Sequence, residues 1–230
     1  MKKLIFVITV IFLLMSCKEK GGINNSLISM NLKGNVKSIT ERRFNAEKKE
    51  GKIVKGEKVK SYNSLTALYF DKEGNIIEKI YYGQGSSIKL KTVYIYDEAG
   101  KLIESEGGYK SGRTEKSIYK TDEKGNVIEE NIFLDSSLVS ISYKTYDEYG
   151  NMIKEKTLKA DGTQESHIVY TYDKKRNIIE YKFLTTDGRN VSSTYRYEYK
   201  FDSKENWVWR LKYDSYGEPY LITEREIEYY

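Results

Sequence analysis

Short runs in which apolar and polar residues alternate make up most of the chain from residue 66 onward. Tyr94 and Tyr96 are two positions apart in one such run, and Tyr170 and Tyr172 are two apart in another. Side chains spaced in this way face the same side of a β-strand. Each run ends at an acidic residue and a turn, after which two apolar residues begin the next run. The pattern therefore predicts antiparallel hairpins in series.

This hairpin pattern occurs six times, and its aspartates are 26, 25, 25, 26 and 29 residues apart. The Asp side chain can accept hydrogen bonds from the backbone that follows it, and a Gly three positions later supplies the positive φ of a tight turn. Units five and six have Arg176 and Glu205 at the Gly position, so we expect the next residue, an Asn, to take the left-handed conformation there. The predicted turn residues are Asp71 and Gly74, Asp97 and Gly100, Asp122 and Gly125, Asp147 and Gly150, Asp173 and Asn177, and Asp202 and Asn206.

Looser turns are expected between the units. They are predicted at Gly83-Gln84-Gly85, Gly107-Gly108, Asp135-Ser136-Ser137, Asp161-Gly162, Asp187-Gly188 and Asp214-Ser215-Tyr216-Gly217. The sole proline, Pro219, lies in the last of these regions, as suits a sheet in which Pro is tolerated at edges and bulges. We expect an all-β antiparallel meander of about 12–14 strands that forms one open elongated or partly rolled sheet.

The repeat resembles the YD-repeat family, also called RHS-type repeats, over residues 66–230. The family pattern is Tyr-Asp, two variable residues, Gly-Asn and an apolar strand, as in Tyr146-Asp147-Glu148-Tyr149-Gly150-Asn151-Met152. The resemblance implies β-hairpin repeats. In large members the hairpins spiral into a shell around a toxin domain, for which this chain has too few repeats. The likeness therefore implies an architecture and no catalytic activity.

The first residues read as a targeting signal. Lys2 and Lys3 precede an uncharged run from Leu4 to Met15, which is too short to span a bilayer as a helix. The run ends in Leu14-Met15-Ser16-Cys17, which resembles the lipobox of bacterial lipoproteins and implies lipidation of Cys17. The residue after it is Lys18 rather than an inner-membrane Asp signal, so the resemblance favours an outer-membrane or surface location. An ordinary signal peptide with a chance Cys is the alternative.

Four regions follow from these patterns. Residues 1–16 form the signal peptide and 17–30 the lipidated Cys and flexible tether. Residues 31–65 form a degenerate N-terminal capping repeat with a basic loop, and 66–230 form the six hairpin repeats. The C-terminal strand places Glu224, Glu226 and Glu228 on one face, and we interpret it as a charged edge that caps the sheet.

The composition and the absence of certain motifs exclude several classes of function. The 230 residues include one Cys and one His, which excludes a disulfide framework and argues against Cys-rich or multi-His metal sites. The net charge of +5 falls to about +3 without Lys2 and Lys3, which does not demand a nucleic-acid partner. No nucleophile elbow or phosphate loop occurs, so we expect no enzymatic activity, cofactor or metal. The sole His, His167, lies off the Tyr170/Tyr172 face, and we expect it to be exposed.

Aromatic residues are the candidate binding surface. Trp207 and Trp209 are two apart and are expected on one strand face, where their rings would stack on a sugar or, alternatively, pack the last hairpin. Tyr94, Tyr96, Tyr170 and Tyr172 offer a second platform, and cross-strand packing accounts for them equally well. We expect a non-catalytic, lipid-anchored scaffold of the cell envelope, with the membrane as one partner and a glycan or a protein as another. A carbohydrate-binding module and an immunity protein beside a secreted toxin are the alternatives. The oligomeric state stays open.

Overall fold

The computed structural model describes residues 25–61, 64–83 and 86–230. The signal peptide, Cys17 and most of the tether lie outside the described residues. The described elements are α1 (Ser26–Ser29), β1 (Val36–Lys49), β2 (Lys52–Lys58), β3 (Leu65–Phe70), β4 (Ile76–Tyr82), β5 (Ile88–Tyr96), β6 (Leu102–Tyr109), β7 (Thr114–Thr121), β8 (Val127–Leu134), β9 (Ser137–Tyr146), β10 (Met152–Lys159), β11 (Gln164–Tyr172), β12 (Ile178–Leu184), β13 (Val191–Phe201), β14 (Trp207–Tyr213) and β15 (Pro219–Tyr229).

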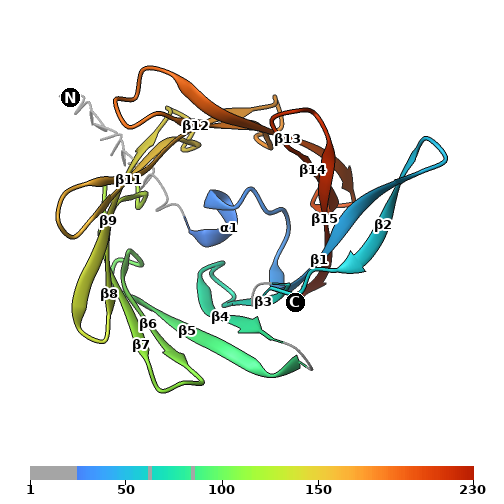
Figure 1. Ribbon diagram of the computed structural model, residues 1–230. Helices are drawn as coiled ribbons and strands as arrows, with labels where there is room; N and C mark the ends of the chain where they lie inside the picture. The colour runs from blue at the N-terminus through green and yellow to red at the C-terminus, as the bar shows by residue number, and fades with distance from the viewer. Residues whose placement is uncertain (1–24, 62–63, 84–85) are drawn as a thin grey trace, which may run out of the picture.

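Strands β3 to β15 pair antiparallel with their sequence neighbours, and β1 pairs with β3 on one side and β15 on the other. The sheet therefore closes into a barrel of 14 strands, and β2, which pairs with β1 alone, projects from its side (Figure 1). The expected all-β antiparallel meander is confirmed. The expected open or partly rolled sheet is wrong, because the first and last strands of the meander form hydrogen bonds with each other.

The six Asp turns lie at one end of the barrel, which we call the Asp-turn end. In the third unit, Oδ1 of Asp122 accepts from the backbone N–H groups of Lys124 and Asn126, both at 2.9 Å. The side-chain amide of Asn126 also donates to Oδ2 of Asp122, at 2.8 Å. One carboxylate thus holds a turn of five residues with three hydrogen bonds, which explains the spacing of Asp and Asn.

The left-handed residue of units five and six differs from the sequence expectation. Arg176 and Glu205 take positive φ angles of 67° and 64°, whereas Asn177 and Asn206 do not. The turn needs a left-handed residue at the Gly position, so a non-Gly residue there adopts that conformation despite its steric strain. The Asn side chains have other tasks, because Asn177 donates to Asp173 and Asn206 donates to the backbone carbonyl of Lys33.

A β-bulge follows each Asp turn and curves the sheet. In the second unit Tyr96 pairs with Leu102 and Ile95 pairs with Glu104, so Ile103 is the extra residue of the returning strand. A bulge increases local twist and coiling, and regular repetition bends a sheet toward closure. The six bulge residues are Ile77, Ile103, Ile128, Ile153, Ile179 and Val208.

Four of the six turns predicted between the units, from Asp135 onward, lie at the opposite end where they were expected. Gly107 and Gly108 lie within β6 rather than in a turn, and the chain reverses between Tyr109 and Arg113 instead. Gly112 takes a φ of 87° in this turn. The predicted turn at residues 83–85 falls partly on residues 84–85, which lie outside the described residues.

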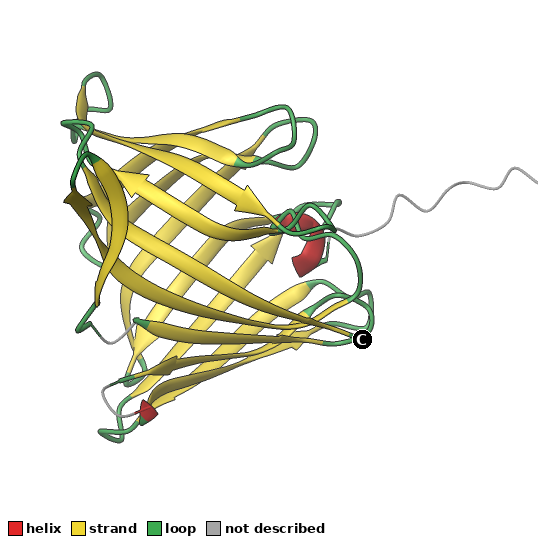
Figure 2. Cartoon of the chain, turned by 90° about the vertical axis from the view of Figure 1, so that its right-hand side faces the viewer, coloured by secondary structure: helices red, strands yellow, loops and turns green. Residues whose placement is uncertain are grey.

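The N-terminal segment from Asn25 to Asn35 lies inside the barrel at the Asp-turn end (Figures 1 and 2). Its Leu32 joins a core with Val36, Ile39, Leu68, Phe70 and Ile76, and α1 contributes Leu27. The segment is fastened across the barrel, since the backbone N–H of Leu27 donates to Gly74 and that of Lys33 donates to Asn206. The packing of this segment shows which face of the sheet lies inside the barrel, because the core side chains of β1, β3 and β4 point toward it.

Ion pairs reinforce the seam between β1 and β15 on both faces. Inside, Nε of Arg225 donates to Glu41 at 2.8 Å, and the side chains are 7% and 12% exposed. Outside, Glu228, Glu226 and Glu224 pair with Lys37, Arg42 and Lys55. The three glutamates share a face as expected, but their strand is a paired member of the barrel, so its interpretation as a charged edge is wrong.

We expect Glu41→Gln to lower the free energy of unfolding by about 3–5 kcal/mol, because Arg225 then keeps a buried charge without its carboxylate. Urea unfolding followed by circular dichroism measures the change. Glu228→Gln, on the outer face of the same seam, should leave the unfolding midpoint nearly unchanged. Equal effects of the two substitutions would contradict a special role for the inner pair.

Candidate functional site in the barrel interior

The tyrosines selected from the sequence face inward, and they brace neighbouring hairpins. The Tyr96 hydroxyl donates to the backbone carbonyl of Ile76 at 2.8 Å, and that of Tyr172 donates to Met152 at 2.7 Å. Burial raises the pKa of Tyr172 to about 12 and raises that of Tyr94 further. Because β5 and β11 are separate parts of the wall, the two pairs do not form one platform, and these hydrogen bonds give Tyr96 and Tyr172 a structural role.

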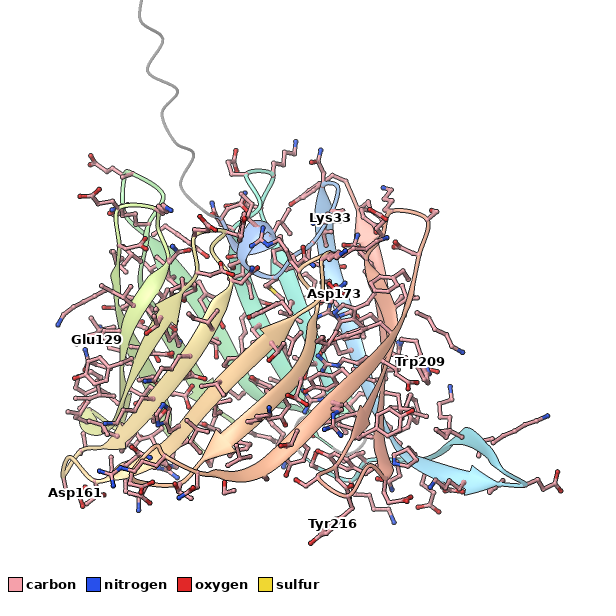
Figure 3. All side chains as sticks on the ribbon, turned by 90° about the horizontal axis from the view of Figure 1, so that it is seen from above. Lys33, Glu129, Asp161, Asp173, Trp209 and Tyr216 are labelled. Carbon is pink, nitrogen blue, oxygen red and sulfur yellow. The ribbon has the colours of Figure 1, made fainter. Side chains whose placement is uncertain are left out.

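Trp207 and Trp209 lie on opposite faces, so their expected shared face is wrong. Trp207 pairs with Phe201 and Trp209 with Lys200, which are adjacent residues of β13. The bulge at Val208 shifts the alternation by one residue between the two rings. Trp207 contacts the inward Arg225, whereas Trp209 lies on the outer surface beneath Lys200 (Figure 3). No two-tryptophan platform exists on this hairpin.

A denser group of aromatic side chains, which is not among the platforms predicted from the sequence, faces inward from β12 and β13. Tyr181 and Tyr195 stack with ring centroids 4.9 Å apart and an interplanar angle of 17°. Tyr197 lies 5.7 Å from Tyr181, and Tyr199 lies 5.9 Å from Trp207. These rings are half-buried although they face the barrel interior, so solvent reaches them from inside.

Cationic side chains cross the same wall on β1, β14 and β15. Arg43 lies opposite Thr223, which lies opposite Arg210, so the register places two guanidinium groups on either side of a small residue. Lys212 follows Arg210 on the same face, and Arg225 follows Thr223. We call Arg43, Arg210, Lys212 and Arg225 the cationic cluster, and together with the rings of Tyr181, Tyr195, Tyr197, Tyr199 and Trp207 they form the interior wall.

Rings and cations of the interior wall are in contact. The Lys212 ammonium lies 4.1 Å from the Tyr195 ring centroid and 4.9 Å from that of Tyr181. The Arg210 guanidinium lies 4.7 Å from the Tyr197 ring and 4.6 Å from the Trp207 ring. Such contacts hold a cation in place while leaving its N–H donors available.

The electrostatics of the wall are strongly positive. Burial, together with the charges of Arg210 and Arg43, lowers the pKa of Lys212 to about 8. Burial likewise lowers the pKa of Arg225 to about 10 despite its bond to Glu41. Burial alone would raise the pKa of Glu41, but the charges of Arg225 and Arg210 outweigh it and hold that pKa below the usual range. Glu41 is the one carboxylate facing inward from β13–β15 and the part of β1 that pairs with β15.

Two buried donor atoms of the cluster have no hydrogen-bond acceptor among the described residues: Nε of Arg43 and Nη1 of Arg225. On the other side of the barrel, Glu130 and Glu155 face inward and share Lys144 at 2.7 and 3.9 Å. The interior therefore carries an excess of positive charge on one side and of negative charge on the other. This arrangement can orient a ligand with a negatively charged group.

His167 is buried rather than exposed as expected, with 8% of its surface accessible. It faces outward, but the turn before β13 covers it, and Gly188 lies against its ring. Burial and the charges of Lys154 and Lys156 lower its pKa. Within the described ranges, no group of three or more His, Cys, Asp and Glu side chains is placed to hold a metal ion.

Two hollows lie away from the interior wall. A cavity of about 260 Å³ separates α1 from the strands behind it and includes Ser26, Tyr96 and Tyr146. An open groove of about 950 Å³ crosses the outer surface of β5–β8, where Gly107 and Gly108 lack side chains. Neither hollow combines several rings with several cations, so the interior wall is the stronger candidate site.

No protein-family model matches the chain, and no curated protein does. Among solved structures, a porin-like protein from Bacteroides vulgatus is 15% identical, with 85% of this chain and 99% of that chain covered and a TM-score of 0.49. A porin-like protein from Bacteroides uniformis is 10% identical, with 84% and 96% covered and a TM-score of 0.48. The Photorhabdus luminescens Tc holotoxin pore is 13% identical over 80% of this chain and 13% of that chain, with a TM-score of 0.21.

We expect the stability of the wild-type protein, relative to Lys212→Met, to rise between pH 8 and 9.5. The folded pKa of Lys212 is about 8 against an ordinary value of 10.5, so in this window the unfolded chain binds the extra proton and folding gains with pH. The midpoint of urea unfolding measures the difference, below the pH at which the tyrosines ionise. Lys200→Met, on the outer face of β13, controls for the loss of a cation–π contact. A constant difference between wild type and Lys212→Met across this range would contradict the assignment.

Proposed function

We propose that the protein is a lipid-anchored, non-catalytic binding protein of the cell envelope, whose barrel is a rigid scaffold that presents the interior wall to a ligand. The observation that carries this proposal is the wall itself. Half-buried rings and cations converge there from β1 and β12–β15, and solvent reaches them from inside the barrel. Catalysis is not part of the proposal, because Glu41, the one carboxylate of this wall, is already held by Arg225.

The charged outer face of the barrel favours attachment to the membrane through a lipid on Cys17, rather than through insertion of the barrel into the bilayer. Ion pairs connect neighbouring strands along it, as between Lys116 and Glu104 at 2.7 Å and between Lys120 and Glu129 at 2.8 Å. Charged side chains facing the hydrocarbon core of a bilayer destabilise a barrel by about 2–4 kcal/mol each near the midplane. Such a wall suits water, and the lipobox at Cys17 supplies the anchor in this proposal. Among the described residues, no helix has the length and apolar character needed to cross a membrane.

The position of Asn25 orients the barrel in this proposal. Its side chain donates to the carbonyl of Glu73 in the first Asp turn. Asn25 lies eight positions after Cys17, and such a length of chain reaches at most about 29 Å when extended. A lipid on Cys17 would therefore hold the Asp-turn end, which the N-terminal segment occupies, toward the membrane. The opposite end of the barrel would face away from the membrane.

A carbohydrate is a second candidate ligand, and the ring arrangement inside the barrel favours it. Tyr181 and Tyr195 present stacked rings, and Trp207 lies further along the same wall. Flat aromatic faces stack on sugar rings, and the neighbouring Arg and Lys side chains can donate to hydroxyl groups. This version replaces the Trp207 and Trp209 platform expected from the sequence with an interior site.

We expect Cys17→Ala to abolish incorporation of a radiolabelled fatty acid and to move the protein from the membrane to the soluble fraction of cells. The reason is that several acyl chains supply the stable attachment, while the ion-paired wall supplies none. Ser16→Gly, which keeps a small residue before the cysteine, should remain labelled and sedimentable. Membrane retention of the unlabelled Cys17→Ala protein would contradict the proposed anchor.

For the carbohydrate candidate, we expect Tyr195→Ala to reduce glycan-array binding by about tenfold or more, because one face of the stacked pair is lost. Trp209→Ala, on the outer surface, should bind like the wild type. Circular dichroism verifies that both variants are folded. Binding that survives Tyr195→Ala but is lost in Trp209→Ala would place the site on the outer face.

A further inference from the structure

The cationic cluster has more donor capacity than the protein uses. Arg225 and Glu41 form one pair, whereas Arg43, Arg210 and Lys212 have no carboxylate partner on this wall. The buried Nε of Arg43 and Nη1 of Arg225 donate to no acceptor among the described residues, and the Arg225 side chain is 7% exposed. Buried donors normally find acceptors, so an unsatisfied pair at one place indicates a group that the chain itself does not supply.

The cost of assembling the cluster supports a functional reason for it. Like charges brought together in a partly buried wall repel each other, and burial together with the charges of Arg210 and Arg43 lowers the pKa of Lys212. The strand register explains why the two arginines lie close together, because Arg43, Thr223 and Arg210 form one row across β1, β15 and β14. Neighbouring strands are about 4.8 Å apart, so the two arginine backbones are separated by about 10 Å. Their side chains can converge over Thr223 on one anionic group.

The chemistry of the donors selects the ligand. Planar guanidinium groups bind carboxylate and phosphate oxygens through two parallel hydrogen bonds, and an ammonium adds a point charge. The rings of Tyr181, Tyr195 and Trp207 flank these donors and offer flat surfaces to a ring. The inward carboxylates of Glu130 and Glu155 lie on other strands, so the anionic end of a ligand is directed toward the cluster.

We propose that the interior wall binds a small ligand that carries a carboxylate or phosphate group on a ring, with Arg43, Arg210 and Lys212 contacting the anion and the aromatic residues contacting the ring. Arg225 holds Glu41 through Nε and contacts Trp207, while its unsatisfied Nη1 adds a donor to the same site. This inference rests on the proposed function as a binding protein. It narrows the ligand from any carbohydrate or other molecule to an anionic one.

The two tryptophans allow a direct test, because they report on opposite faces of the same hairpin. In Trp209→Phe the remaining ring is Trp207, whose neighbours are Arg210 at 4.6 Å and Arg225. In Trp207→Phe the remaining ring is Trp209, beneath Lys200 at 4.6 Å. Each full-length variant is purified in detergent, and its fluorescence is titrated with glucuronate, glucose 6-phosphate, inorganic phosphate and glucose.

We expect saturable fluorescence changes in Trp209→Phe with glucuronate or glucose 6-phosphate, and none in Trp207→Phe. The preferred one of these two identifies whether the anion is a carboxylate or a phosphate. Glucose and inorganic phosphate should bind at least tenfold more weakly, since each lacks half of the ligand. Adding Arg210→Gln to Trp209→Phe should weaken binding at least tenfold, whereas adding Lys200→Gln should not.

Three results would overturn the inference. If glucose bound as tightly as glucuronate and glucose 6-phosphate, the ligand would not need an anionic group, although a carbohydrate-binding function would stand. Binding that is unaffected by Arg210→Gln in a folded variant would place the anion elsewhere. If no probe changed the fluorescence but glycan-array binding still depended on Tyr195, the anionic ligand alone would be rejected. If neither assay gave a signal, the proposed interior site would be rejected as well.

Discussion

Pairing between β1 and β15 is the constraint on which the rest of the structure depends. Nine residue pairs join the two strands, from Val36 with Tyr229 to Asn45 with Leu221. Without them the meander would be an open sheet with two long edges, each a template for pairing with other chains. Closure also creates an inside, so that Glu41 and Arg225 become a buried pair and the N-terminal segment gains walls against which to pack.

The bulges make this seam reachable. Each Asp turn is followed by one extra residue on the returning strand, and the extra twist is added at the same place in every unit. The repetition matters more than any one bulge, because curvature accumulates around the sheet until its ends meet. The same irregularity decides which side chains share a face. At Val208 it separates two tryptophans that alternation alone would place together, leaving one inside and one outside.

The seam and the candidate site are physically connected. Arg43 and Arg225 reach the interior wall from β1 and β15, and Arg210 and Lys212 reach it from β14. The cationic cluster is therefore formed only in the closed barrel, and the seam positions half of its members. The charges of the outer face are balanced, because acidic and basic side chains pair across neighbouring strands and remain exposed. The inner wall keeps its positive charge unbalanced, and this contrast supports the proposed anionic ligand.

The sequence by itself determined the strands, the Asp turns and the shared face of the paired tyrosines, because each depends on residues close together in the chain. Asp122 and Asn126 form their turn within five residues, and Tyr94 and Tyr96 share a face through simple alternation. The sequence did not determine closure, since the partners of the seam are nearly 200 positions apart and nothing local records their pairing. It also misplaced Trp207 and His167, because a bulge changed the face of one and a distant turn buried the other. Only the tertiary structure brought Arg43, Arg210, Lys212 and Arg225 together, since curvature and register across three strands set their spacing.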